Sequence, residues 1–150
     1  MRYIKLFEEL NIEFTEDKGV YYFTDNNQNN YRVYFSGPLS SKELSFLGLS
    51  YKITFELEFL TQHNDYTHMT SAGQPFSVSN LIFDNILKDF LKKNNKCERI
   101  LIESLDSKRK SLYLRSLKKV LKDINFEIEY IDYPEENDII ISKAVIVSNQ

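Results

Sequence analysis

Alternating apolar and polar residues mark the most regular stretch of the chain, residues 51–60. From Tyr51 to Phe59 every odd-numbered position is apolar, and the even-numbered positions from Lys52 to Glu58 are polar. A period of two over this length is typical of a β-strand with one buried face. The polar face of the predicted strand carries two carboxylates, Glu56 and Glu58.

A second period, of three to four residues, begins about twenty residues later. It predicts a helix with one apolar side, formed by Val78, Leu81, Ile82, Ile86, Phe90 and Leu91. Pro75 and Ser77 suit the first turn, where a missing N–H is tolerated and a hydroxyl can cap. The cations and asparagines of residues 92–95 suit the last turn.

The next segments complete a βαβ unit. Arg99–Ser104 contains the continuous apolar run Ile-Leu-Ile, which is typical of a buried strand. Because a helix separates it from the strand at residues 51–60, we expect the two strands to be parallel neighbours. Asp106 or Ser107 then caps a second helix, and Phe126–Ile131 returns as a strand.

These patterns predict a single α+β domain with helices packed on a mixed, mostly antiparallel sheet that contains one parallel crossover. Val20–Thr24 and Tyr31–Phe35 read as a hairpin, whereas Leu39–Leu49 fits either a loop covering the sheet or a β-excursion. The expected parts are an N-terminal helix (residues 1–11), an antiparallel meander (12–60), the βαβ-type core (70–131) and a closing strand (132–150).

Composition narrows the class of protein. With 150 residues and 42% hydrophobic content, the chain has enough apolar material for one core, filled by Phe and Tyr because Trp is absent. No apolar run approaches the roughly 18 residues of a membrane span. The single Cys97 fits a reducing cytoplasm. The abundance of Asn, Lys, Ile, Tyr and Phe reflects A/T-rich codons and favours a bacterial or phage gene. We expect a cytoplasmic protein, which for a phage gene means the host cytoplasm or the virion.

The order of elements from Val20 to Val147 resembles the core of the GNAT acetyltransferases. In that fold a meander leads into a strand, and the following turn and helix hold the pyrophosphate of coenzyme A. A parallel strand and a helix beginning near S-x-x-x-L-Y come next. The matching pieces here are Tyr51–Leu60, Thr70–Ser77, Ile100–Ser104 and Ser107–Tyr113. The C-terminal two-thirds is also similar to small uncharacterised phage-encoded proteins with a T-x-x-G turn.

The resemblance implies a cofactor site at the start of the first helix, where backbone N–H groups converge on an anion. The residues that would bind acetyl-CoA are Ser71, Ala72, Gly73, Gln74, Phe76, Ser77 and Val78. The family pattern at this turn is Gln or Arg, two residues, Gly, any residue, then Gly or Ala. With Gly73 at its glycine, Thr70 stands at the Gln/Arg position and Pro75 at the last one. Pro75 has no N–H, and the bulky Phe76 follows it.

The resemblance also implies catalytic roles. Glu56 or Glu58 would accept a proton from an amine, and Tyr113 would protonate the departing thiolate. The alternative interpretation is structural: the glutamates lie on a wet strand face, and Tyr113 packs in the core.

The charged residues indicate one further candidate binding surface, on the second helix. Lys108, Arg109, Lys110 and Arg115 open a strongly basic helix, which we interpret as a phosphate- or partner-binding face or as a solvated surface. His63 and His68 flank Asp65 in a polar loop, and we predict no metal site there.

Because of the departure at Pro75, we expect a small phage-type or accessory protein with a GNAT-like fold that binds an unknown protein partner without catalysis. The alternatives are an acyl-CoA-dependent N-acetyltransferase and a nucleic-acid contact through the basic helix at residues 108–122. A net charge of −3 gives no overall attraction to nucleic acid. No membrane association is expected.

Overall fold

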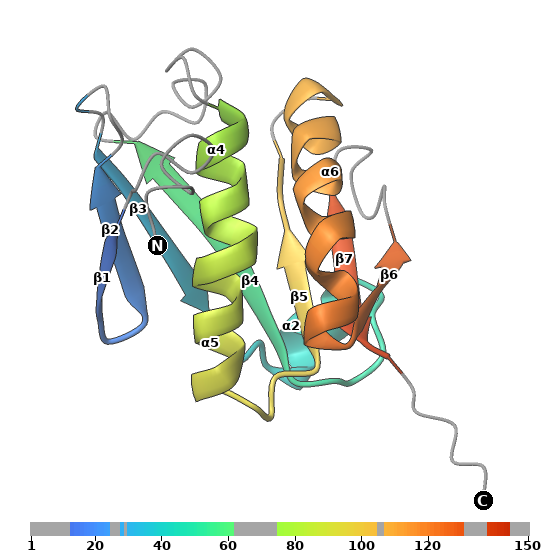
Figure 1. The fold of residues 1–150 in the computed structure, drawn as a ribbon. Helices are drawn as coiled ribbons and strands as arrows, with labels where there is room; N and C mark the ends of the chain where they lie inside the picture. Colours follow the sequence, from blue (N-terminus) through green and yellow to red (C-terminus); the bar gives the residue numbers. More distant parts are fainter. Residues whose placement is uncertain are drawn as a thin grey trace, which may run out of the picture.

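The computed structural model describes residues 13–24, 28, 30–61, 75–104, 107–130 and 138–144. Within these ranges seven strands form one sheet in the order β1-β2-β3-β4-β5-β7-β6 (Figure 1). The strands are β1 (Phe14–Asp17), β2 (Val20–Thr24), β3 (Asn30–Ser36), β4 (Thr54–Thr61), β5 (Arg99–Ile102), β6 (Phe126–Tyr130) and β7 (Ile139–Lys143). The N-terminal helix expected over residues 1–11 lies outside the described residues.

Strands β4 and β5 are parallel, as the sequence predicts. Their register runs from the pair Thr54–Arg99 to the pair Leu57–Ile102. The other strand pairs of the described sheet are antiparallel, including the β2–β3 and β6–β7 hairpins. The expected α+β class with one parallel crossover is therefore confirmed. The chain order does not reveal that β7 lies between β5 and β6.

Helices cover the two faces of the sheet unequally. The crossover helix comprises α4 (Pro75–Asn80), a π-helical turn (Leu81–Ile86) and α5 (Leu87–Lys93), and it lies beside α6 (Ser107–Ile124) on one face. The short helix α2 (Ser41–Phe46) lies on the other face (Figure 1). Strand alternation explains the division: Ile100 and Ile102 belong to the large core under α4 and α6, whereas Leu101 packs with Leu44 of α2.

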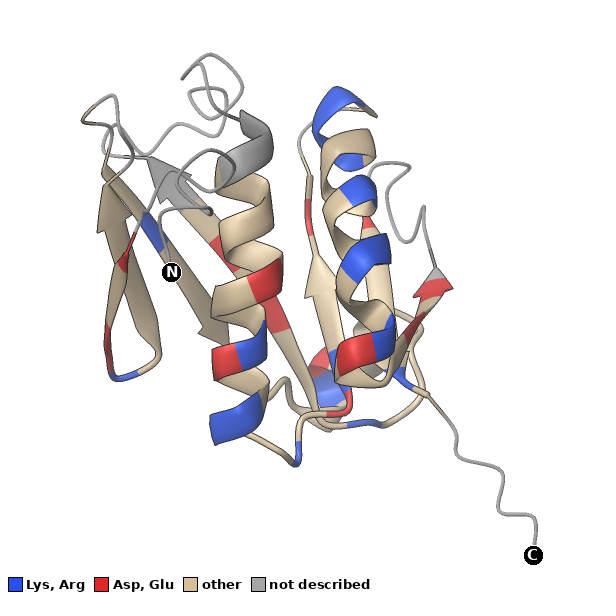
Figure 2. Ribbon diagram, in the orientation of Figure 1, with Lys and Arg blue, Asp and Glu red and all other residues tan. Residues whose placement is uncertain are grey.

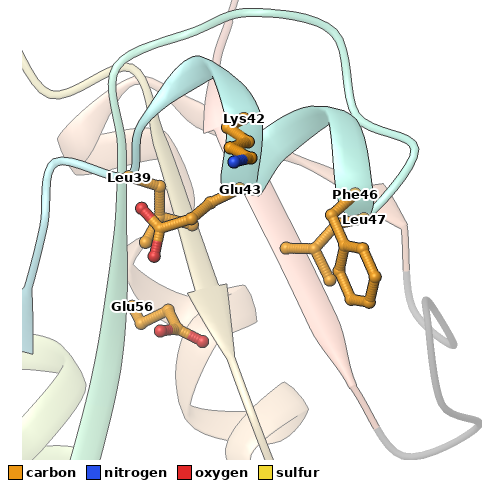
Figure 3. Close-up of a pocket in the computed structure, with 6 residues that line it drawn as sticks. All are labelled: Leu39, Lys42, Glu43, Phe46, Leu47 and Glu56. Carbon is orange, nitrogen blue, oxygen red and sulfur yellow. The ribbon is translucent and has the colours of Figure 1, made fainter.

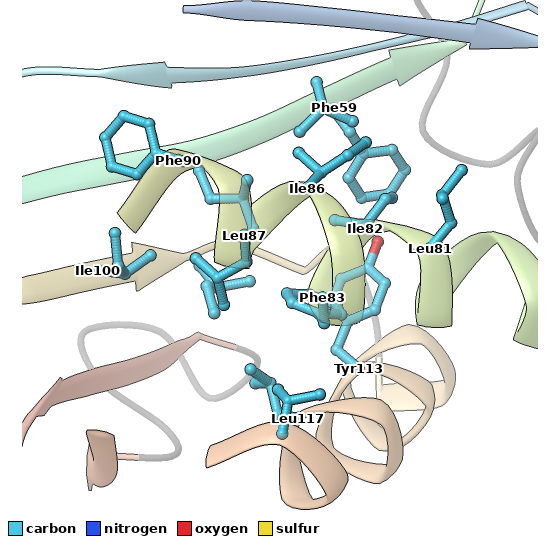
Figure 4. Close-up of a cluster of buried hydrophobic side chains, with 14 of the residues drawn as sticks. Phe59, Leu81, Ile82, Phe83, Ile86, Leu87, Phe90, Ile100, Tyr113 and Leu117 are labelled. Carbon is cyan, nitrogen blue, oxygen red and sulfur yellow. The ribbon is translucent and has the colours of Figure 1, made fainter. Parts of the chain in front are cut away.

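The large core is aromatic and aliphatic, and Figure 4 shows its centre between the crossover helix and α6. Three successive apolar residues, Leu81, Ile82 and Phe83, are all buried, which is wider than the apolar stripe of a regular helix. The π-helical turn coincides with this broad apolar surface. The buried hydroxyls of Ser79 and Ser116 satisfy each other across the two helices at 2.8 Å.

Two sequence predictions need correction near β4. The strand begins at Thr54 rather than Tyr51, because the backbone of Ile53 is used elsewhere: its N–H donates to the Glu98 carboxylate, and its carbonyl accepts from the Glu98 and Arg99 N–H groups. In the ambiguous segment 39–49, the expected covering of the sheet is right, but neither the loop nor the β-excursion is, because Ser41–Phe46 forms the helix α2. Ser40 and Glu43 cap its first turn reciprocally.

The side chain of Arg99, at the start of β5, binds residues of β4, β6 and the loop before β4. That side chain is 0% exposed. The guanidinium donates to the Glu129 carboxylate at 3.1 and 3.4 Å, to the Ser50 carbonyl at 2.9 Å and to the Thr54 hydroxyl at 3.3 Å. One buried cation thereby joins β6, the loop before β4 and the parallel pair.

We expect Arg99→Met to lower the free energy of unfolding by about 3 kcal/mol, since it leaves the partners of a buried charge unsatisfied. Lys52→Met is the matched control, because Lys52 lies 4.0 Å from the same carboxylate but its side chain is 38% exposed. Its loss should change stability by less than about 1 kcal/mol. Urea denaturation measures both variants, and equal effects would contradict the role given to Arg99.

Candidate functional site

Four carboxylates gather on the α2 face of the parallel strands. Glu56 and Glu58 project from β4 on the α2 face, because Leu57 and Phe59 between and beside them belong to the core on the other face. Glu103 follows β5 directly, and Asp138 precedes β7. The charges of Glu58, Glu103 and Asp138 all act on the Glu56 carboxyl, so these four carboxylates form one cluster.

A pocket of about 410 Å³ lies beside this cluster, between α2 and β4. Its lining is mainly apolar and comprises Leu39, Lys42, Glu43, Phe46, Leu47 and Glu56. Figure 3 shows the carboxylates of Glu43 and Glu56 at one end and the side chains of Phe46 and Leu47 at the other. Phe46 is 90% exposed, which is unusual for a large apolar side chain. The pocket thus combines an apolar wall with one acidic end.

The two pocket carboxylates have opposite electrostatic environments. Partial burial raises the pKa of Glu56, and the charges of Glu103 and Glu58 raise it further. By contrast, the Ser40 N–H and hydroxyl, which bond to Glu43 in the helix cap, lower the pKa of that carboxyl. Glu56 is therefore the pocket residue that gains most from a cation or a proton placed next to it.

Glu58, the next carboxylate along β4, is held by a neighbour. The Tyr34 hydroxyl donates to its Oε1 at 2.8 Å, across the β3–β4 pair in which the two residues face each other. Glu58 also lies one residue beyond Leu57, the last β4 residue paired with β5. From Glu58 onward β4 continues while β5 has ended.

Tyr113, the third predicted catalytic residue, lies on the opposite face of the sheet. Its side chain is 1% exposed, and its ring packs against Phe59 at 5.6 Å and Phe83 at 5.5 Å between centroids (Figure 4). The sheet thus separates Tyr113 from both glutamates. The interpretation of Tyr113 as a packing residue agrees with these contacts.

The expected cofactor residues are only partly described. Ser71, Ala72, Gly73 and Gln74 lie outside the described residues. Phe76 and Ser77 fall in the first turn of α4, which begins at Pro75 as the sequence predicts. The side chain of Val78 is buried in the core. Val78 therefore reaches a ligand only through its backbone.

The four basic residues predicted to bind phosphate or a partner differ in exposure. Arg109 is 2% exposed and belongs to the buried side of α6, whereas Lys108 and Arg115 are exposed and Lys110 is half-buried. The exposed basic surface continues beyond this set, through Lys118, Lys119 and Lys122. The pocket under α2 has no counterpart in the sequence predictions, although the S-x-x-E spacing from Ser40 to Glu43 is a helix-start signal that identifies α2.

Because the pKa of Glu56 is raised in the folded state, its ionised form destabilises the fold, and stability falls as pH rises through that pKa. We expect Glu56→Gln to raise Tm at pH 7 and to lose this advantage as the pH falls to about 4, near the unfolded pKa. Glu58→Gln, which weakens the acceptor of the Tyr34 hydroxyl, should give no such gain. Thermal unfolding from pH 4 to 8 compares the two. A lower Tm for Glu56→Gln at pH 7 would contradict this electrostatic picture.

Comparisons with known proteins give no family assignment: neither a scan against protein-family models nor a search of curated proteins found a match. In the described ranges, no helix is long and apolar enough to cross a membrane. The same ranges contain no group of three His, Cys, Asp or Glu side chains placed to hold a metal ion. Function is therefore inferred from the contacts and charges of the pocket.

Proposed function

We propose that this protein binds a protein partner by accepting a basic side chain into the pocket between α2 and β4, and that it does so without catalysis on a GNAT-like fold. The observation that carries the proposal is the half-buried Glu56, which lies with Glu43 at one end of a mainly apolar pocket whose lining contains a single cation, Lys42. A lysine side chain suits this pocket. Its aliphatic stem would contact Leu39 and Leu47, and its ammonium group would bind the carboxylates.

The surroundings of the pocket favour a protein over a free small molecule. Phe46 stands almost fully exposed at the pocket, and Tyr51 is also exposed after the loop that follows α2. Aromatic side chains of this kind are enriched at protein interfaces, where they anchor around a central pocket. Tyr113, buried on the other face of the sheet, supports the non-catalytic part of the proposal.

The peptide acetyl-Leu-Lys-Leu-amide is a suitable probe, followed by amide chemical shifts in a titration. We expect shifts at Leu39, Lys42 and Leu47, and about tenfold weaker binding by Glu56→Gln, because a charge-assisted hydrogen bond is lost. Glu127→Gln, an exposed carboxylate on β6, is the matched control and should bind like the unmodified protein. Equal binding of the peptide with Glu in place of Lys would contradict the proposal.

One observation favours a second candidate, acyl-CoA-dependent N-acetylation of the same lysine. Beyond the pair Leu57–Ile102 the strands β4 and β5 no longer pair, and Glu58 and Phe59 project there to opposite faces. A thioester at this point would be open to an amine on the α2 face. The amine nitrogen would attack the acyl carbon as the carbon–sulfur bond breaks, Glu56 or Glu58 would take the amine proton, and Tyr113 would protonate the sulfur.

Acetyl-CoA separates the two candidates. A non-catalytic protein shows no ligand-dependent rise in Tm up to millimolar acetyl-CoA, whereas a coenzyme A binder is stabilised progressively. Acetylation of the lysine peptide, detected by mass, would replace the non-catalytic proposal with the second candidate. Peptide binding without a rise in Tm and without acetylation supports the non-catalytic candidate.

A further inference from the structure

We propose that the exposed face of α6 binds the phosphate backbone of nucleic acid. The helix runs from Ser107 to Ile124, and Figure 2 shows basic residues along its length. Lys108, Arg115, Lys119 and Lys122 are all exposed and follow one another at intervals of seven, four and three residues. Those intervals place side chains on the same side of a helix. Lys118 borders the same side and is also exposed.

The five exposed cations, which we call the basic stripe, extend over about 21 Å of helix at 1.5 Å per residue. The nearest acidic residue on α6 is Asp123, which pairs with Lys88 of α5 at 3.2 Å. The first turn contains no acidic residue but carries Lys108, although cations near a helix N-terminus oppose the helix dipole. The helix dipole therefore disfavours Lys108 at the start of the stripe, whereas it favours Lys122 in the last turn.

The composition of the stripe favours a phosphate backbone over an acidic protein. A protein interface normally has an apolar or aromatic centre surrounded by polar residues. The apolar neighbours on α6, Leu112 and Leu114, pack against the core instead. Between the cations the exposed position is Ser111. A surface of regularly spaced cations without apolar contact is the chemistry that neutralises phosphates non-specifically.

The stripe is independent of the pocket. It lies on the α6 face of the sheet, whereas Glu56 and α2 lie on the other face, so a bound polyanion leaves the pocket accessible. The net charge of −3 opposes attraction of the whole molecule to a polyanion. Any binding of nucleic acid at low salt must therefore come from a local concentration of cations.

Fluorescence anisotropy with a 20-base-pair DNA duplex tests the proposal across 20 to 200 mM salt. We expect the logarithm of the association constant to fall with the logarithm of salt at a slope of about −4.5, as five phosphate contacts on duplex DNA require. Lys118→Gln/Lys122→Gln should reduce the slope by about 2 and weaken binding about tenfold or more at low salt.

Lys92→Gln/Lys96→Gln is the matched control, since it removes two exposed cations with the same spacing from the end of α5 and the turn after it. It should bind DNA like the unmodified protein, and so should Glu56→Gln, which makes this test independent of the pocket. No binding at 20 mM salt, or equal losses in the two lysine pairs, would overturn the proposal. Competition by poly-glutamate as strong as that by DNA at equal charge would assign the stripe to an acidic protein instead.

Discussion

The parallel pairing of β4 with β5 is the constraint on which the rest of the structure depends. Two parallel neighbours require a crossover, and the helix from Pro75 to Lys93 supplies it on one face of the sheet. The next helix, α6, packs beside it on that face, so the other face is left to the short helix α2. Among the described residues, the polar side of β4 consequently meets the short helix α2, and Glu56 becomes the acidic end of a pocket instead of an ordinary surface residue.

The same division separates the charges of the molecule. Carboxylates gather along β4 and directly after β5 on the α2 face, while α6 carries the basic stripe on the other face. A net charge of −3 conceals this separation, because it sums two surfaces that attract opposite partners. The pocket and the stripe can therefore act at the same time, with the sheet between them.

The sequence predicts the elements whose periodicity is regular and misses those that tertiary contacts decide. The alternation along β4 and the buried run of β5 are unambiguous, and their parallel pairing follows from the helix between them. The start of β4 shifts to Thr54 because distant residues, Glu98 and Arg99, capture the backbone of Ile53. The sequence does not predict the pocket, because its walls come from two separate elements, α2 and β4, which are brought together only when the chain folds. Arg109 is indistinguishable from its basic neighbours in sequence, yet its position on the helix buries it.

The most direct test of this account is the direction of β5 relative to β4, which NMR measures through cross-strand nuclear Overhauser effects between backbone protons. The structure predicts contacts that link Phe55 with Ile100 and Leu57 with Ile102, in increasing order along both strands. Contacts in the reverse order, pairing Thr54 with Ile102 and Leu57 with Arg99, would show antiparallel strands. That result would remove the crossover, the division of the two faces and the pocket together.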